Sequence, residues 1–158
     1  MARPVWVFDT SGLIEIKSLP REKRPRLMAK LSDLVKEGRL RMPNQVVAEL
    51  ERYADAIHEW AVEVQGIACS GSPSFEDVLQ VQAIVPKVLD TKKDVGVDEA
   101  DPYVLALARM IKLHGEDVRV VTQETKDTPL KMSLNTAAGI LGIPSVPLIG
   151  FMHVEEIS

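Results

Sequence analysis

The feature that most constrains the fold of this chain is a short apolar run that ends in an acid. The run Val5–Phe8 is wholly apolar and is followed directly by Asp9. An apolar run of this length predicts a strand that is buried on both faces, as in a parallel sheet. Asp9 would then lie at the carboxyl end of the strand, where open parallel sheets form their ligand crevice. A carboxylate in such a crevice is costly unless positive charge compensates it, so Asp9 indicates a functional site.

Helical and strand patterns alternate along the rest of the chain. Further strands are predicted at 39–42, 118–122 and 145–149, and helical patterns begin near residues 13, 27, 44, 55, 75, 101 and 133. This alternation predicts an α/β fold, a three-layer sandwich with a central parallel sheet of four to five strands flanked by helices. The length of 158 residues is close to that of one ordinary domain, so we expect a single domain over residues 1–158.

Polar residues predict where several of these helices begin. Asn44 and Ser133 each precede an apolar stripe and are good N-cap residues. Ser74 is predicted to cap the helix that follows it in the same way. Asp101 is followed by Pro102, which predicts Asp101 as an N-cap with proline at the first helical position.

Composition places the chain among globular proteins of the cell interior. Hydrophobic residues make up 46% and charged residues 27% of the chain. Cys69 is the only cysteine, so an internal disulfide is excluded, which suits a reducing compartment. No apolar run approaches the roughly 20 residues that span a bilayer, and the N-terminus lacks the pattern of a signal peptide. We therefore expect a soluble cytoplasmic protein.

The charge distribution leaves the question of nucleic acid open. A net charge of −4 argues weakly against a nucleic-acid partner. Basic residues nevertheless concentrate in one short stretch, where Glu22 is the only acid among them. This stretch is either a solvated helix face or a surface for RNA backbone contacts. Its members are Arg21, Lys23, Arg24, Arg26 and Lys30.

Four acids occupy unusual positions, and a fifth lies close to one of them. Asp9 follows the first strand, and Glu124 follows the strand predicted at 118–122 by two residues. Glu49 interrupts the apolar stripe of a helix, and Asp101 lies at a helix N-terminus with Asp98 just before it. Because the carboxyl ends of parallel strands lie on one edge of a sheet, Asp9 and Glu124 are expected to meet at one crevice.

Grouped carboxylates repel one another unless cations lie among them. Oxygen-only ligands of this kind suit Mg²⁺ or Mn²⁺, and such ions bind phosphate oxygens and activate water. The pattern therefore predicts hydrolysis of a phosphodiester bond. Three of the acids also have a structural interpretation: Asp101 as a helix cap, Glu124 as a surface loop residue, and Glu49 as a residue that reaches solvent or pairs with Arg52 or Tyr53.

The acids lie in motifs that resemble those of the PIN-domain nucleases, including toxins of the VapC type. The resemblance covers nearly the whole chain. It is carried by an acid followed by two hydroxyl residues, by Glu beside Leu in a helix, by Asp before a helix of small apolar residues, and by Thr-x-acid after a strand. In this chain the motifs are Phe8–Ser11, Val46–Leu50, Asp101–Ala108 and Val120–Glu124. The fourth motif departs from the family pattern because Glu124 stands where Asp is usual. The closing run Leu148–Met152 is similar to a tail found in a VapC-like branch.

The resemblance implies a Mg²⁺- or Mn²⁺-dependent endoribonuclease that leaves a 5′-phosphate. It implies that Asp9, Glu49 and Asp101 bind the metal, with Glu124 or Asp98 completing the set. The hydroxyls of Thr10, Ser11 and Thr122 would hold these ligands or water. The resemblance also implies a homodimer and, for a toxin, an antitoxin protein that blocks the site.

Two other functions remain open on the sequence alone. A PIN-like domain without catalysis would serve as an interaction module, and Glu124 in the fourth motif favours this alternative. A phosphotransfer domain would also place an acid such as Asp9 after a strand of a parallel sheet. The phosphotransfer patterns fit less well, because position 11 is Ser11 rather than a second Asp, and residues 145–150 contain no Lys.

Overall fold

A four-stranded, all-parallel sheet forms the centre of the protein. The computed structural model describes residues 3–53, 55–85, 100–128 and 132–158. The strand order is β2-β1-β3-β4, so β1 is a central strand, as its apolar sequence predicts. Val5 to Phe8 of β1 lie opposite Val118 to Val121 of β3. The strands are β1 (Val5–Phe8), β2 (Leu40–Arg41), β3 (Val118–Val121) and β4 (Ser145–Val146).

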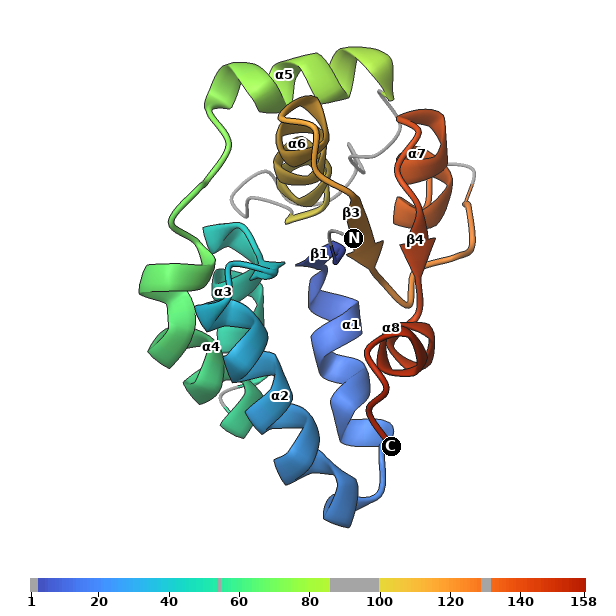
Figure 1. The fold of residues 1–158 in the computed structure, drawn as a ribbon. Helices are drawn as coiled ribbons and strands as arrows, with labels where there is room; N and C mark the ends of the chain where they lie inside the picture. Colours follow the sequence, from blue (N-terminus) through green and yellow to red (C-terminus); the bar gives the residue numbers. More distant parts are fainter. Residues whose placement is uncertain (1–2, 54, 86–99, 129–131) are drawn as a thin grey trace.

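Helices cover both faces of this sheet, which gives the predicted three-layer α/β sandwich. Helices α6 and α7 lie on one face with α5 packed outside α6, and α1, α2 and α8 lie on the other (Figure 1). Helices α3 and α4 flank the edge formed by β2 (Figure 1). The helices are α1 (Thr10–Ile14), α2 (Arg24–Lys36), α3 (Asn44–Leu50), α4 (Ala56–Ala68), α5 (Phe75–Ile84), α6 (Ala100–Leu113), α7 (Leu134–Ile140) and α8 (Leu148–Val154).

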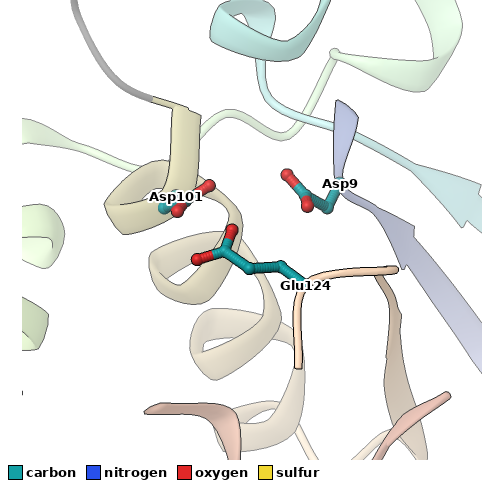
Figure 2. A group of neighbouring side chains, drawn as sticks. All are labelled: Asp9, Asp101 and Glu124. Carbon is teal, nitrogen blue, oxygen red and sulfur yellow. The ribbon is translucent and has the colours of Figure 1, made fainter. Parts of the chain in front are cut away.

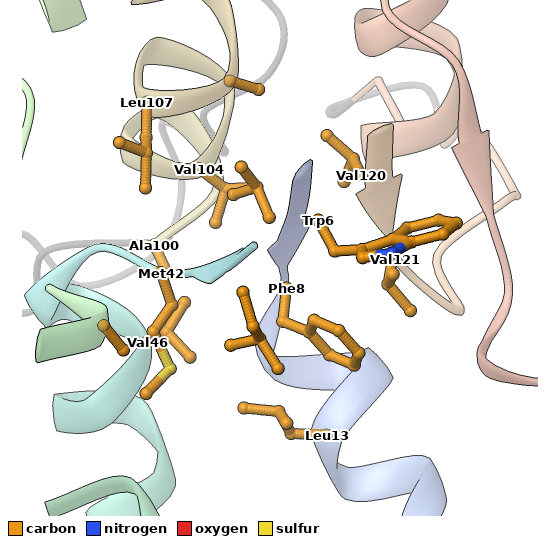
Figure 3. Packing of buried hydrophobic residues seen from close by; sticks show 14 of the residues in the cluster. Trp6, Phe8, Leu13, Met42, Val46, Ala100, Val104, Leu107, Val120 and Val121 are labelled. Atoms are coloured by element: carbon orange, nitrogen blue, oxygen red, sulfur yellow. The ribbon is translucent and has the colours of Figure 1, made fainter. Parts of the chain in front are cut away.

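Strand β1 lies in the centre of the hydrophobic core. The rings of Trp6 and Phe8 point to one face of the sheet, where each meets the ring of Phe151 edge-on at a centroid distance of 4.9 Å. Figure 3 shows Leu13 of α1 below Phe8, and Val104 of α6 on the other side of the strand. Because both faces of β1 are buried in this way, the position of its carboxyl end is rigidly determined.

The last predicted strand is only partly correct. Strand β4 ends at Val146, and α8 begins at Leu148, within the predicted range 145–149. The apolar residues Leu148, Phe151 and Met152 have helical spacing and are all buried. Burial of Phe151 against Trp6 and Phe8 therefore requires a helix here rather than an extended strand.

Two of the predicted helix caps are also wrong. Pro43 is the N-cap of α3, and Asn44 is its first residue. The Asn44 side chain instead accepts a hydrogen bond from Gln65 Nε2 and donates one to Ser72 Oγ, so it links α3 to α4 and to the loop after α4. Asp101 is the second residue of α6 rather than its N-cap.

The other caps are as predicted, and no membrane span is found. The hydroxyls of Ser74 and Ser133 accept hydrogen bonds from backbone N–H groups in the first turns of α5 and α7. Among the residues that the structure describes, no helix combines the length and the apolar character needed to cross a bilayer.

Candidate metal centre

The site begins where β1 ends and α1 begins. Asp9 has an extended backbone and is the N-cap residue of α1, but its side chain makes no capping hydrogen bond. Its backbone N–H donates to Val121 O at 3.0 Å, which continues the pairing of β1 with β3. The Asp9 carboxylate is therefore fixed at the carboxyl edge of the sheet, and the residue is only 2% exposed.

Two hydroxyl groups hold one oxygen of this carboxylate. Ser11 Oγ and Thr122 Oγ1 donate to Asp9 Oδ2 at 2.7 and 2.9 Å. The same hydroxyls accept from the segment after β3: Gln123 N–H donates to Ser11 Oγ, and Glu124 N–H donates to Thr122 Oγ1. Ser11 and Thr122 thus connect Asp9 to the backbone that carries Glu124.

Three of the predicted acids converge at this edge. Asp9, Asp101 and Glu124 each offer a carboxylate oxygen, and these three oxygens lie within 4.8 Å of one another. Figure 2 shows their carboxylates directed into the same space from the end of β1, the first turn of α6 and the segment after β3. Asp9 meets Asp101 and Glu124, which follow it by 92 and 115 positions, because β1 and β3 are adjacent parallel strands and α6 immediately precedes β3.

Burial and mutual repulsion make this group costly without a cation. Removal from water raises the pKa of Asp9 from 3.8 to about 7, and the nearby charge of Asp101 acts in the same direction. The hydrogen bonds from Ser11 and Thr122 oppose this rise in pKa, and the charge of Glu49 adds to it. Asp9 is therefore far more perturbed than a surface acid, which is typical of carboxylates in functional sites.

Glu49 lies beside the group but is not one of the three acids that converge. Its Oε1 accepts a hydrogen bond from Thr10 Oγ1 at 2.5 Å, and its Oε2 accepts one from the Ala100 N–H at 3.3 Å. Glu49 therefore bridges the first residue of α1 and the first residue of α6. Thr10 binds Glu49 rather than Asp9, unlike the other two predicted hydroxyls.

A glycine permits the close approach of α1 to β3 at this point. A Cβ atom on Gly12 would lie 2.8 Å from Val121 O and 3.1 Å from Val121 Cγ1. Contacts this short with a backbone oxygen require the helix to move. Gly12 thus allows the turn that carries Asp9 and Ser11 to lie directly against the end of β3.

With this geometry in hand, the chain can be compared with known families. A family model described as "Domain of unknown function (DUF4411)" matches residues 6–158. The chain belongs to the DUF4411 family. A search among curated proteins found no match. The family description names no reaction, so the chemistry of this DUF4411 chain has to be inferred from the site itself.

Only one of the two acids predicted to complete the set, Glu124 or Asp98, lies within the described residues. Glu124 belongs to the converging group, although it is one methylene longer than the Asp expected in that motif. Asp98 lies outside the described residues. Among the described residues of this DUF4411 chain, Glu124 is the acid that joins Asp9 and Asp101 from the carboxyl end of β3.

The predicted RNA-binding residues lie away from the acidic group. Arg21 and Lys23 belong to a 3₁₀ turn, and Arg24 and Arg26 to the first turn of α2. The nine residues of α1 and the 3₁₀ turn after it separate this region from Asp9, a length of about 15 Å. Figure 1 accordingly shows the start of α2 at the end of α1 that is far from β1.

One of these arginines has a structural role as well. The Arg24 guanidinium donates to Lys17 O and Leu19 O, and so holds the turn between α1 and α2. Arg26 donates to Ser158 Oγ near the end of the chain. Any RNA that reaches both regions would have to extend along α1 from the acidic group.

Two residues that shape the site, Gly12 and Gln123, were not predicted from the sequence. Gln123 Oε1 accepts the backbone N–H of Leu148 at 2.6 Å and so ties the end of β3 to the start of α8. Gly12 follows the acid-hydroxyl-hydroxyl motif directly, and a glycine in the first turn of a helix is an indication of close packing. Gln123 lies between Thr122 and Glu124 and carries no comparable pattern.

The three acids suit a hard divalent cation. The group contains only carboxylate oxygens, the ligand type that Mg²⁺ and Mn²⁺ prefer over softer metals. The cation would compensate the burial and repulsion that raise the pKa of Asp9. Within the described part of the chain, Asp9, Asp101 and Glu124 are therefore residues that could hold such an ion.

Proposed function

We propose that this protein is a Mg²⁺- or Mn²⁺-dependent endoribonuclease of the PIN type. The single observation that carries the proposal is the convergence of Asp9, Asp101 and Glu124 at the carboxyl edge of a parallel sheet. The order of motifs that resembles PIN-domain nucleases supports the same conclusion. The observed α/β sandwich is compatible with it.

The residues of the site have distinct roles in this proposal. Because Ser11 and Thr122 both donate to Oδ2 of Asp9, Oδ1 is the oxygen that we expect to bind the ion. Asp101 and Glu124 supply the other carboxylates, and Glu124 is oriented through its backbone bond to Thr122. The bound ion would lower the pKa of a bound water and neutralise a phosphate oxygen of the RNA. Because the ligands are buried and already held in place, little reorganisation would be needed as negative charge develops on the phosphate.

The decisive test combines metal binding with cleavage. Wild type is expected to bind Mn²⁺ in calorimetry and to cut end-labelled single-stranded RNA into products with a 5′-phosphate, and EDTA should stop the reaction. Asp9→Asn should lose both properties while its circular dichroism spectrum is unchanged. Asp33→Asn is the matched control, because it removes the same charge from a residue that is exposed on α2.

Other outcomes separate the alternative functions. A wild-type protein that binds no Mn²⁺ would contradict the nuclease and favour a catalytically silent interaction module. Covalent labelling of Asp9 by a phosphoryl donor would favour a phosphotransfer domain. Cleavage that persists in Asp9→Asn would remove Asp9 from the mechanism.

RNA contact by the basic cluster is part of the proposal. Arg21, Lys23 and Arg26 are exposed and lie at the start of α2. Lys23→Gln together with Arg26→Gln should weaken RNA binding and reduce its dependence on salt, because each phosphate contact releases counterions. Arg24 is left unchanged in this test, since its bonds to Lys17 O and Leu19 O are structural.

We further propose that the protein acts as the toxin of a toxin–antitoxin pair. A pocket of about 620 Å³ between α2 and α4 is lined by apolar residues that include Trp60 and by the charged residues Lys17, Arg24 and Asp55. Its position beside the basic start of α2 suits an acidic, amphipathic partner segment. Expression of wild type without its antitoxin should arrest growth, and expression of Asp9→Asn should not. Sedimentation would test the homodimer that the resemblance implies.

A further inference from the structure

Glu49 bridges the starts of two helices that carry the candidate metal ligands. Its carboxylate accepts one hydrogen bond from the side chain of Thr10 and one from the backbone of Ala100. Thr10 is the first residue of α1 and follows Asp9 directly, and Ala100 is the first residue of α6 and precedes Asp101 directly. Each bond therefore acts on the immediate neighbour of a converging acid.

Both oxygens of Glu49 are occupied by donors of the protein itself. The bond with Thr10 is short, at 2.5 Å, and the bond with Ala100 is 3.3 Å. Glu49 is also absent from the group of three acids whose oxygens lie within 4.8 Å of one another. These two bonds orient the Glu49 carboxylate towards the starts of α1 and α6.

The bond to Ala100 has a further consequence for α6. The first N–H groups of a helix have no partner within the helix, and a carboxylate beside them is favourable because of the helix dipole. By accepting the Ala100 N–H, Glu49 ties the first residue of α6 to α3. Asp101, the next residue, is thereby held on the side of the helix that faces Asp9 (Figure 2).

We propose that Glu49 is a positioning residue that clamps α1 and α6 together, and that it does not bind the metal ion directly. This inference rests on the proposed function, because it concerns the same ion. It departs from the role as a metal ligand that the family resemblance implies for Glu49. The ligand set of this chain is then Asp9, Asp101 and Glu124.

The conservative variant Glu49→Gln distinguishes a clamp from a ligand. The glutamine carbonyl can accept the Ala100 N–H while its amide donates to Thr10 Oγ1, so both links to the neighbouring helices can persist. The negative charge and the carboxylate oxygens are lost. A clamp therefore tolerates this substitution, whereas a metal ligand does not.

Mn²⁺ affinity, measured by calorimetry on the full chain, is the first readout. We expect the Mn²⁺ affinity of Glu49→Ala to fall by about 10- to 100-fold, as on loss of a residue that orients metal ligands. Glu49→Gln should lose clearly less, because it keeps both links and removes only a charge that acts on the site through space. Thr10→Val should resemble Glu49→Ala, and Thr10→Ser should resemble wild type. A loss of affinity in Glu49→Gln as large as in Asp9→Asn would overturn the proposal.

A second readout does not depend on the metal. In EDTA, Glu49→Ala and Thr10→Val should each lower the urea midpoint of unfolding, and the double variant should unfold at the same urea concentration as Glu49→Ala alone. Additive effects would show that no clamp exists. If wild type binds no Mn²⁺, the nuclease proposal fails and the positioning role in metal binding fails with it. If wild type binds Mn²⁺ and Glu49→Gln does not, only the clamp fails.

Discussion

At the scale of single residues, the burial of Asp9 makes the stability of the metal-free protein depend on pH. Its pKa is about 7 in the folded protein and has an ordinary value of 3.8. Between these two pH values the folded state holds the proton more tightly than the unfolded state does. The stability contributed by the protonated group is therefore complete below pH 3.8 and is lost as the pH rises towards 7, by on the order of 4 kcal/mol.

This dependence can be measured by urea unfolding in EDTA. Wild type should become less stable between pH 5 and pH 8, and Asp9→Asn should show a flatter profile and exceed wild type in stability at pH 8. Asp33→Asn, the exposed control on α2, should retain the wild-type profile. An Asp9→Asn profile as steep as that of wild type would mean that another group titrates in this range. Added Mn²⁺ should reduce the loss of wild-type stability between pH 5 and pH 8, because it favours the ionised carboxylate of Asp9.

A second residue-scale prediction concerns the hydroxyl of Thr122. It donates to Asp9 and accepts from the Glu124 N–H, so Thr122→Val removes a bond that lowers the pKa of Asp9 and leaves the part-buried Glu124 N–H without that partner. We expect a loss of about 1–3 kcal/mol in stability and a shift of Mn²⁺ binding to higher pH. Thr122→Ser keeps the hydroxyl and should bind Mn²⁺ at the same pH as wild type. Equal behaviour of the valine and serine variants would exclude a role for the hydroxyl.

At the scale of the elements, the contact between α1 and β3 determines the geometry of the site. Gly12→Ala would place a Cβ atom 2.8 Å from Val121 O, so α1 would have to move away from β3. We expect a loss of about 1–3 kcal/mol in stability, as on overpacking, together with weaker Mn²⁺ binding, because Asp9 and Ser11 adjoin the shifted turn.

Gly66 offers a matched control for this substitution. It lies within α4 and is exposed, and a Cβ atom there would meet nothing within 4 Å. Gly66→Ala should therefore stabilise the protein by about 0.5–1 kcal/mol through helix propensity alone. If Gly12→Ala and Gly66→Ala both raised the urea midpoint above that of wild type, or both lowered it, the close approach of α1 to β3 would be contradicted.

The sequence was sufficient where a single local pattern determines an element. Strand β1 was predicted because all of its residues are apolar, and Ser74 and Ser133 were predicted as caps because their hydroxyls act on nearby N–H groups. Prediction failed where contacts between distant residues determine the secondary structure of a segment. The run from Leu148 is helical because Phe151 packs against Trp6 and Phe8, two residues more than 140 positions away.

The acidic group was predictable in part, because the sheet topology places two of its members and tertiary packing places the residues around them. The position of Asp9 after β1 and of Glu124 after β3 follows from the topology of a parallel sheet, which the alternation of patterns indicates. The placement of Glu49 does not follow, because its two hydrogen bonds depend on how α3 packs between α1 and α6. The spacing of acids in a sequence cannot distinguish a ligand from a residue that bridges two helices.

At the scale of the whole molecule, the two ends of β1 carry different charged groups. Beyond the amino end, Arg39 forms an ion pair with Glu155 just after α8, and Trp6 Nε1 donates to the same Glu155 oxygen at 2.8 Å. Burial by itself would raise the pKa of Glu155, but the bonds from Trp6 and Arg39 and the charge of Arg39 lower it below its ordinary value. This ion pair connects the end of the chain to the central strand and to the residue before β2.

Removal of one partner should therefore be costly. The Arg39 and Glu155 side chains are 11% and 6% exposed, so Glu155→Gln leaves a buried guanidinium without its negative partner. We expect a loss of about 3–5 kcal/mol in the free energy of unfolding at neutral pH. Asp117→Asn is the control, because the Arg119–Asp117 pair is 30% and 45% exposed and should contribute less than about 1 kcal/mol.

The Arg39–Glu155 pair and the acidic group around Asp9 are far enough apart that we expect them to act independently. Trp6 and Asp9 are three residues apart along an extended chain, or about 10 Å, so a change at Glu155 should not alter the acidic group. At a Mn²⁺ concentration of a hundred times Kd, wild type should gain about 2.7 kcal/mol, and Glu155→Gln should gain the same increment from its lower baseline. Asp9→Asn should gain nothing. A smaller increment in Glu155→Gln would mean that the two ends of β1 are coupled through the sheet.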